Sequence, residues 1–289
     1  MPVTPPTLTR NTFVFQGHEV RYFTAGRGKP VVFLHNGGND HRVWDFQLER
    51  FSRNHAVYAL DHLGYGQSDK PEVAYSLDLY SSMLAGFLAE RGLESVTLVG
   101  NCVGSAMSLH HALQTPEKIA GLVLFNVLTA KTLSYGRFGG LSRAVARAPV
   151  LGRILRRAAR RLVLPAFSRT PVFRMQYGTT FSEEQEFVQH LHELYDDPHQ
   201  IRVLLSLLLN LRSYAALDEL VKPARFPPVC LIWGAQNAIL PSIGEKELSH
   251  RLRPDQVWVV ADCGHLVMRE RHEEVSEYMD VFMQRHEGG

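Results

Sequence analysis

The sequence predicts an α/β protein in which helices cover both faces of a mainly parallel sheet. Short β-branched, apolar runs alternate along the chain with segments of helical spacing. Strands that alternate with helices imply right-handed crossovers, and these bring successive strands into one parallel sheet. The composition agrees, because 45% hydrophobic and 21% charged residues in a chain of 289 are enough to bury a core and exclude a disordered protein.

Eight runs have the length and residue types of strands. The first two predict a hairpin around Gly17-His18, and the fully apolar third run is typical of a buried strand. The predicted strands are 12–15, 19–24, 30–34, 55–60, 96–100, 119–125, 229–233 and 257–260. The predicted helices of this alternation are 77–90, 106–113, 242–252 and 273–285.

The middle of the chain differs in charge from its flanks. Residues 129–225 hold 15 Lys and Arg against 8 Asp and Glu, and they contain no convincing strand. We therefore expect a core made of residues 1–128 and 226–289, with residues 129–225 inserted as a basic, helical cap.

Several classes of protein are excluded by what the sequence lacks. The amino terminus has no basic and apolar signal segment, and no apolar run approaches the ~18 residues of a membrane span. Three cysteines, an odd number, argue against a disulfide framework and fit a reducing compartment, so we expect a cytoplasmic protein. We expect neither a cofactor nor a metal, and no nucleic-acid-binding motif is present.

The most informative segment is Gly100-Asn-Cys102-Val-Gly104, which joins a predicted strand directly to a helix. In such a turn the central residue is strained, and the two glycines let strand and helix approach each other. The side chain of Cys102 is then presented at the carboxyl ends of the strands, where open α/β sheets bind ligands. The helix amino terminus is expected to lower the pKa of this thiol.

This turn resembles the nucleophile elbow of the α/β-hydrolase superfamily, with cysteine in place of the usual serine. Four further segments resemble landmarks of that family in the same order: an oxyanion loop, an Asp-x-x-Gly-x-Gly-x-Ser turn, the strand that delivers the acid and the Gly-His pair that delivers the base. They are His35-Asn-Gly-Gly38, Asp61–Asp69, Leu231–Asn237 and Cys263-Gly-His265.

The resemblance implies an eight-stranded α/β-hydrolase sheet with a helical cap, and a catalytic triad of Cys102, His265 and Asn237. Asn237 stands where the family has aspartate, and the other position known for the acid, after the sixth strand, is Asn126. An asparagine carbonyl can orient histidine by accepting its Nδ1–H, as in papain-like sites. The backbone amides of Asn36 and Val103 are the expected oxyanion donors.

The resemblance and the site predict an enzyme that cleaves or transfers an acyl group, from an ester or thioester, through Cys102. The alternatives are an acyltransferase rather than a hydrolase, a ligand-binding protein without catalysis, and a lyase or cofactor-free oxygenase. Aliphatic residues of the cap, such as Leu204–Leu211, suggest an apolar substrate. The seven arginines in residues 141–164 could attract an anionic carrier, such as coenzyme A or acyl-carrier protein, or an anionic lipid surface.

Overall fold

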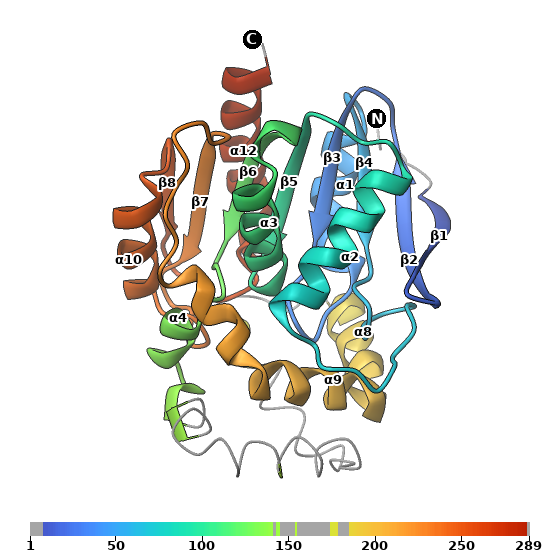
Figure 1. Ribbon diagram of the computed structural model, residues 1–289, viewed down its shortest axis with the longest axis vertical. Coiled ribbons are helices and arrows are strands. Elements are labelled where there is room, and N and C mark those ends of the chain that lie inside the picture. Colours follow the sequence, from blue (N-terminus) through green and yellow to red (C-terminus); the bar gives the residue numbers. More distant parts are fainter. Residues whose placement is uncertain (1–7, 141–142, 145–153, 155–173, 179–184, 288–289) are drawn as a thin grey trace.

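The computed structural model describes residues 8–140, 143–144, 154, 174–178 and 185–287, and it contains the predicted eight-stranded sheet (Figure 1). The strands follow the spatial order β1-β2-β4-β3-β5-β6-β7-β8. All eight coincide with predicted runs to within a few residues at either end. They are β1 (Thr9–Phe15), β2 (His18–Ala25), β3 (Lys29–Leu34), β4 (His55–Leu60), β5 (Val96–Asn101), β6 (Ile119–Phe125), β7 (Val229–Gly234) and β8 (Gln256–Val260).

The sheet is parallel from β4 to β8, which confirms the fold class. β2 runs antiparallel both to β1 and to β4, whereas every other neighbouring pair is parallel. The hairpin turns at Gln16 and Gly17, one residue earlier than expected, with φ angles of 51° and 81°. Two successive positive φ angles suit the tight turns that match the twist of paired strands.

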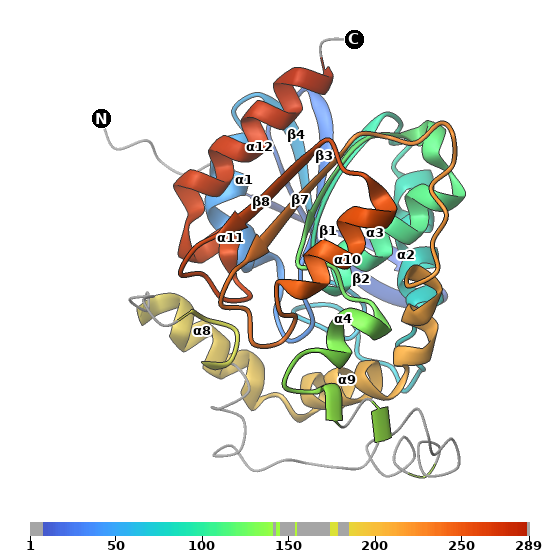
Figure 2. The same ribbon diagram turned by 90° about the vertical axis from the view of Figure 1, so that its left-hand side faces the viewer.

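Helices cover both faces of the sheet, as predicted (Figure 2). On one face α2 (Leu77–Glu90), α3 (Val103–Gln114) and α10 (Ile243–Leu252) pack over an apolar core. On the other face α1 (Asp45–Phe51) and α12 (His272–Glu287) pack over a second core. Sequence patterns did not predict α1, because its seven residues span only two helical turns. Short elements complete this part of the chain: η1 (His41–Trp44), η2 (Pro116–Lys118) and α11 (Val267–Glu270).

The described part of residues 129–225 is helical and contributes no strand. Its elements are α4 (Ala130–Ser134), α8 (Gln185–Asp196), α9 (Pro198–Leu209) and η4 (Leu211–Leu217), and they gather at the end of the molecule opposite to the carboxyl terminus (Figure 1). Most of the arginine-rich stretch 141–164 lies outside the described residues. Among the residues described, no helix combines the length and the apolar character needed to cross a membrane.

Candidate active site

Cys102 sits in a strained turn between β5 and α3. Its backbone angles, φ 55° and ψ −107°, are rarely adopted by residues other than glycine. The two flanking glycines are needed for close contact. A Cβ on Gly104 would lie 2.1 Å from the carbonyl oxygen of Leu34, and a Cβ on Gly100 would lie 2.4 Å from the backbone of Gly104. The turn therefore has the geometry that its sequence predicted.

The thiol of Cys102 is buried against two backbone amides. The backbone N–H groups of Val103 and Gly37 favour its thiolate form, and the residue is 8% exposed. Burial nevertheless raises the pKa of the thiol to about 12, because it disfavours the charged thiolate more than the two amides favour it. The amide at the helix amino terminus therefore does act to lower this pKa, as expected, but burial outweighs it and favours the neutral thiol.

The second amide that favours the thiolate belongs to Gly37, one residue after the predicted Asn36. The side chain of Asn36 has another use, since its Nδ2 donates to Oε1 of Gln176 at 2.9 Å. His35 anchors the same loop: its Nδ1 donates to the carbonyl of Asn36 at 2.7 Å, and its Nε2 accepts from the amide of His62 at 2.9 Å. Gly37 of this loop therefore acts on the Cys102 thiol, and the Asn36 amide as an oxyanion donor stays a prediction.

His265 lies on the loop after β8, and Asn237, on the loop after β7, contacts its ring. The Nδ2 atom of Asn237 is 2.9 Å from Nδ1 of His265. His265 is 1% exposed, and burial lowers its pKa to about 3. No hydrogen bond joins His265 to Cys102 in the part of the chain that the structure describes. The resting pair is consequently a neutral imidazole and a neutral thiol.

The side-chain amide of Asn237 faces the ring with its nitrogen, opposite to what the sequence led us to expect. Its oxygen accepts from the backbone N–H groups of Ile239 at 3.0 Å and Leu240 at 2.9 Å. Backbone N–H groups can only donate, so they fix the position of that oxygen. The nitrogen is left to donate to His265 Nδ1 and, at 2.9 Å, to Oδ1 of Asn126.

Asn126 belongs to the same network, one step further from the ring. Its Oδ1 accepts from the amide of Gly234 at 3.2 Å, and its Nδ2 donates to the carbonyl of His265 at 3.1 Å. Asn101 donates to that same carbonyl at 3.1 Å, which ties the histidine loop to the residue before Cys102. The structure therefore answers which asparagine contacts the ring: Asn237 does, and Asn126 holds Asn237.

Two further residues position the histidine loop, and sequence reasoning missed both. The backbone carbonyl of Gln176 accepts from the amides of His265, at 2.6 Å, and Leu266. The buried carboxylate of Glu270 accepts from Gly264 at 2.9 Å and Gly178 at 2.8 Å. Neither residue belongs to a motif, so only the folded chain reveals that residues 176–178 pack against this loop.

The other two cysteines, Cys230 and Cys263, do not occupy a strained strand-to-helix turn. Cys230 is buried within β7, as expected of a core residue, and Cys263 is buried beside the histidine loop. Burial raises the pKa of each thiol to about 12. All three thiols are free of disulfide bonds.

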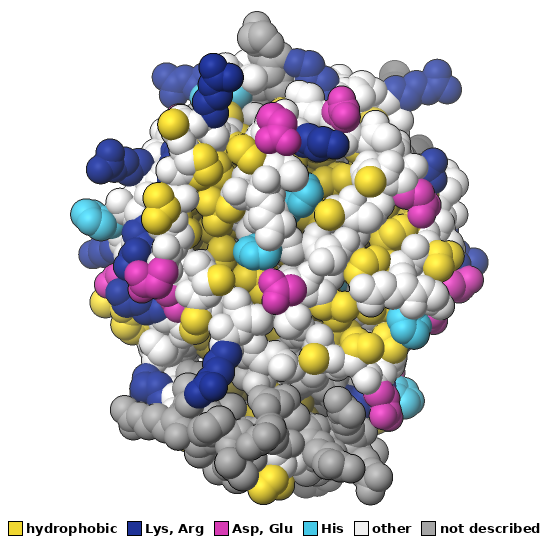
Figure 3. Space-filling view, viewed as in Figure 1, with side chains coloured by type: hydrophobic (Ala, Val, Ile, Leu, Met, Phe, Trp, Pro, Cys, Tyr) yellow, Lys and Arg dark blue, Asp and Glu magenta, His cyan; other side chains and the backbone are white. Residues whose placement is uncertain are grey.

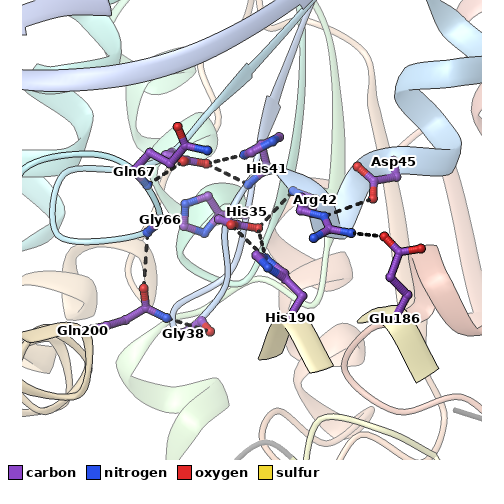
Figure 4. A network of polar contacts seen from close by, with 12 residues as sticks. His35, Gly38, His41, Arg42, Asp45, Gly66, Gln67, Glu186, His190 and Gln200 are labelled. Carbon is purple, nitrogen blue, oxygen red and sulfur yellow. Dashed lines mark hydrogen bonds and ion pairs between the residues drawn. The ribbon is translucent and has the colours of Figure 1, made fainter. Parts of the chain in front are cut away.

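A second buried polar cluster lies beside the loop that holds His35 and Gly38 (Figure 4). Asp61 accepts from the backbone and from the Nδ1 of His41, at 2.9 and 2.8 Å, and Asp40 binds Nε2 of His190 on α8 at 2.9 Å. Asp40, His41 and Asp61 offer ligand atoms within 4.8 Å of one another. Because hydrogen bonds within the protein already use these atoms, the cluster is best explained as a brace between the core and α8.

One face of the molecule carries the charges of its described residues in a mixed arrangement (Figure 3). On the face shown in Figure 3, basic, acidic and apolar side chains are interspersed, and no continuous patch of one sign covers its described residues. Long-range attraction of a charged partner would thus have to come from elsewhere on the molecule.

Known proteins share this fold. The sequence profile of the alpha/beta hydrolase fold family matches residues 29–271, well over half of the chain. The chain belongs to this family. Its eight-stranded, mainly parallel sheet with helices on both faces is the fold that the resemblance had implied.

Individual relatives have low sequence identity to this chain, but the similarity extends over almost its whole length. An uncharacterized protein of Mycobacterium tuberculosis is 25% identical over 96% of this chain and 81% of its own. A 2-hydroxy-6-oxo-2,4-heptadienoate hydrolase of Pseudomonas putida is 26% identical over 89% of each chain. Among solved structures, a bacterial membrane phospholipase A shares the fold with a TM-score of 0.79 and 20% identity, over 98% of this chain and 87% of the other.

Proposed function

We propose that the protein is an enzyme that cleaves or transfers an acyl group by forming a thioester on Cys102. The observation that carries the proposal is the strained turn that holds Cys102 between β5 and α3, where the backbone amides of Val103 and Gly37 favour its thiolate. Strain at one residue and two amides that favour its thiolate are arrangements typical of a nucleophile beside an oxyanion hole.

The proposed chemistry starts from the carbonyl carbon of the substrate. The thiolate of Cys102 attacks this carbon and forms a C–S bond, and the electron pair of the C=O bond moves to the oxygen. The amides of Val103 and Gly37 stabilise that oxyanion. Collapse of the intermediate expels the leaving group and leaves the acyl group on sulfur. The proposed triad is Cys102 with His265 and Asn237, in which Asn237 acts on the ring through its amide nitrogen.

The acceptor of the acyl group decides between two reactions. Water as acceptor gives a carboxylic acid and makes the protein an ester or thioester hydrolase, and the hydrolase named among its relatives favours this outcome. A second alcohol, amine or thiol as acceptor makes it an acyltransferase. We expect an apolar acyl group, because the leucines Leu204 and Leu207 of α9 lie next to Gly37.

One observation favours a second candidate, a ligand-binding protein without catalysis. The resting thiol and imidazole are both neutral, and no hydrogen bond joins them among the described residues. Such a site can bind a carbonyl compound without reacting. The two candidates differ in whether the Cys102 sulfur acquires a covalent adduct.

Intact-mass spectrometry during turnover separates these candidates. The protein is mixed with the hexanoyl thioester of a small thiol, quenched in acid and weighed. We expect the mass of one hexanoyl group on the wild type and none on Cys102→Ala. Cys230→Ala, which removes another buried thiol, is the matched control and should still be acylated. Turnover without any adduct, or unchanged turnover in Cys102→Ala, would contradict the proposal.

A further inference from the structure

We infer that the asparagine network holds His265 as the neutral Nε2–H tautomer, so that the site favours acyl compounds whose leaving group departs as a stable anion, thioesters above all. The inference rests on the proposed chemistry of Cys102 and names its class of substrate. It differs from the usual role of a triad histidine, which accepts a proton from the nucleophile and passes it to the leaving group.

The tautomer follows from the hydrogen bonds of Asn237. A ring nitrogen that receives an N–H must present its lone pair, so Nδ1 of His265 carries no hydrogen while the amide of Asn237 donates to it. In a neutral imidazole the single proton is then on Nε2. His35 provides a comparison within the same molecule, because a carbonyl faces its Nδ1 and therefore fixes the opposite tautomer.

The side-chain amide of Asn237 cannot exchange the positions of its oxygen and nitrogen without losing hydrogen bonds. Exchange of its oxygen and nitrogen would place the NH2 group against the N–H groups of Ile239 and Leu240. It would also place the oxygen against Oδ1 of Asn126, which is held in turn by the amide of Gly234. Three of the four contacts of this amide would then place donor against donor or acceptor against acceptor, and buried polar groups are rarely left unpaired.

The same network opposes the charged form of the ring. An imidazolium would carry a hydrogen on Nδ1, where the N–H of Asn237 already points. A carboxylate at this position would favour the imidazolium, but Asn237 and Asn126 are neutral and Asn237 presents a donor. Burial of the ring acts in the same direction by lowering the pKa of His265.

The neutral Nε2–H form of His265 limits which proton transfers the ring can carry out during the reaction. With a proton on Nε2 and the lone pair of Nδ1 taken by Asn237, the ring cannot accept the thiol proton, which goes to hydroxide from the solvent. It also cannot supply a proton to the leaving group, which must break away with the bonding electron pair. Thiols, with a pKa near 8.5, leave as anions far more readily than alkoxides or amines do. Water later attacks the carbonyl carbon of the acyl-Cys102 thioester and the C–S bond breaks, which yields the carboxylate, the Cys102 thiol and one proton released to the solvent.

Nitrogen NMR of histidine-labelled protein tests the tautomer without reference to any reaction. In two-bond 1H–15N spectra we expect the His265 ring to show a proton on Nε2 and a bare Nδ1 over about pH 5 to 9. His265→Gln assigns the signals by their loss. A proton on Nδ1, or an imidazolium at neutral pH, would overturn the inference even if Cys102 is acylated.

A series of substrates with one acyl group tests the consequence for the leaving group. Hexanoyl thioester, 4-nitrophenyl hexanoate, ethyl hexanoate and hexanamide are compared by the rate of Cys102 acylation. We expect the ethyl ester to react at least about 100-fold more slowly than the thioester, because general acid catalysis typically contributes 100-fold or more. Similar rates for the thioester and the ethyl ester would overturn the inference while leaving the proposed function intact.

The matched variant is Asn237→Asp, whose carboxylate can accept from Nδ1–H. We expect it to move the ring proton to Nδ1 in the NMR spectrum and to narrow the gap between thioester and ethyl ester by about tenfold or more. Because its carboxylate also faces Oδ1 of Asn126, its folding is checked by thermal unfolding. Should it fail to fold, Asn237→Ala, which removes the fixed donor, takes its place. An Nδ1 that stays without a proton in the folded variant would contradict the role assigned to Asn237.

Discussion

The side-chain nitrogen of Asn237 donates to Nδ1 of His265 across 2.9 Å. In a triad with aspartate the direction of this hydrogen bond is reversed, because a carboxylate accepts from the ring. One substitution in the acid position therefore changes which ring nitrogen holds the proton. As a consequence, His265 does not serve as a strong base for the thiol of Cys102.

Asn237→Ala is expected to slow the acylation of Cys102 by about 10- to 1,000-fold, because the ring loses the group that orients it. The measurement is the single-turnover rate of acyl-enzyme formation with the hexanoyl thioester. Asn11→Ala, on the edge strand β1, is the control and should react like the wild type. An unchanged rate in Asn237→Ala would mean that other contacts suffice to orient His265.

Gly104→Ala should destabilise the protein by about 1–3 kcal/mol or more, because its Cβ would overlap the carbonyl oxygen of Leu34 at 2.1 Å. Gly86→Ala, within α2, is a matched control whose Cβ meets Phe15 at an ordinary 3.7 Å. That control should gain about 0.5–1 kcal/mol, since alanine favours helix over glycine. Urea unfolding measures both changes. Equal stability of the two variants would show that the turn can relax around a methyl group.

His41→Gln is expected to lower stability by an amount that depends on pH. Burial alone would lower the pKa of His41, but the hydrogen bond and charge of Asp61 outweigh it and raise this pKa above its ordinary value. A raised pKa stabilises the fold fully below about pH 6.5, and this contribution disappears as the pH rises through the folded-state pKa. The loss in the variant should therefore be about 1–3 kcal/mol in mild acid and smaller in alkali.

Urea unfolding at about pH 5.5 and pH 8.5, on either side of the ordinary histidine pKa, measures this difference. His199→Gln, at an exposed position of α9, is the control for the substitution itself. A loss in His41→Gln that grows with pH would contradict the assignment of a charged His41 beside Asp61.

Much of the fold could be predicted from sequence because its signals are local. The run Ile119–Phe125 is apolar throughout, and it forms β6 with those bounds. The turn at Cys102 could also be predicted, since both flanking glycines appear in the sequence. By contrast, the direction of the Asn237 amide depends on Ile239, Leu240 and Asn126 together. A sequence shows that an asparagine is present, but not which end of it meets the ring.

The same limit of sequence-based prediction applies to the loop that holds His35 and Gly38. Asn36 and Gly37 are adjacent, and only the folded loop decides which backbone amide acts on the thiol. Likewise Gln176 contacts the histidine loop from a segment that no motif marks. Local sequence patterns do not encode contacts between segments that are distant along the chain.

The arginine cluster Arg153, Arg156, Arg157 and Arg160, outside the described residues, remains a sequence prediction about an anionic carrier. Replacement of these arginines by glutamine should raise KM for a coenzyme A thioester at low salt. It should leave KM for the same acyl group on a small neutral thiol nearly unchanged. The difference should fade as salt rises, because exposed charges are screened. Equal changes for both substrates would indicate a role in folding instead.

The pH dependence of Cys102 alkylation tests the neutral resting site most directly. The rate with iodoacetamide is followed by the mass of the peptide that contains Cys102, so that Cys230 and Cys263 are resolved from it. A thiol with a pKa of about 12 predicts a rate that rises about tenfold for each pH unit between about pH 6 and pH 9. A rate that is already high at about pH 6 and stays constant above it would contradict the account, because it would reveal a thiolate paired with a charged His265.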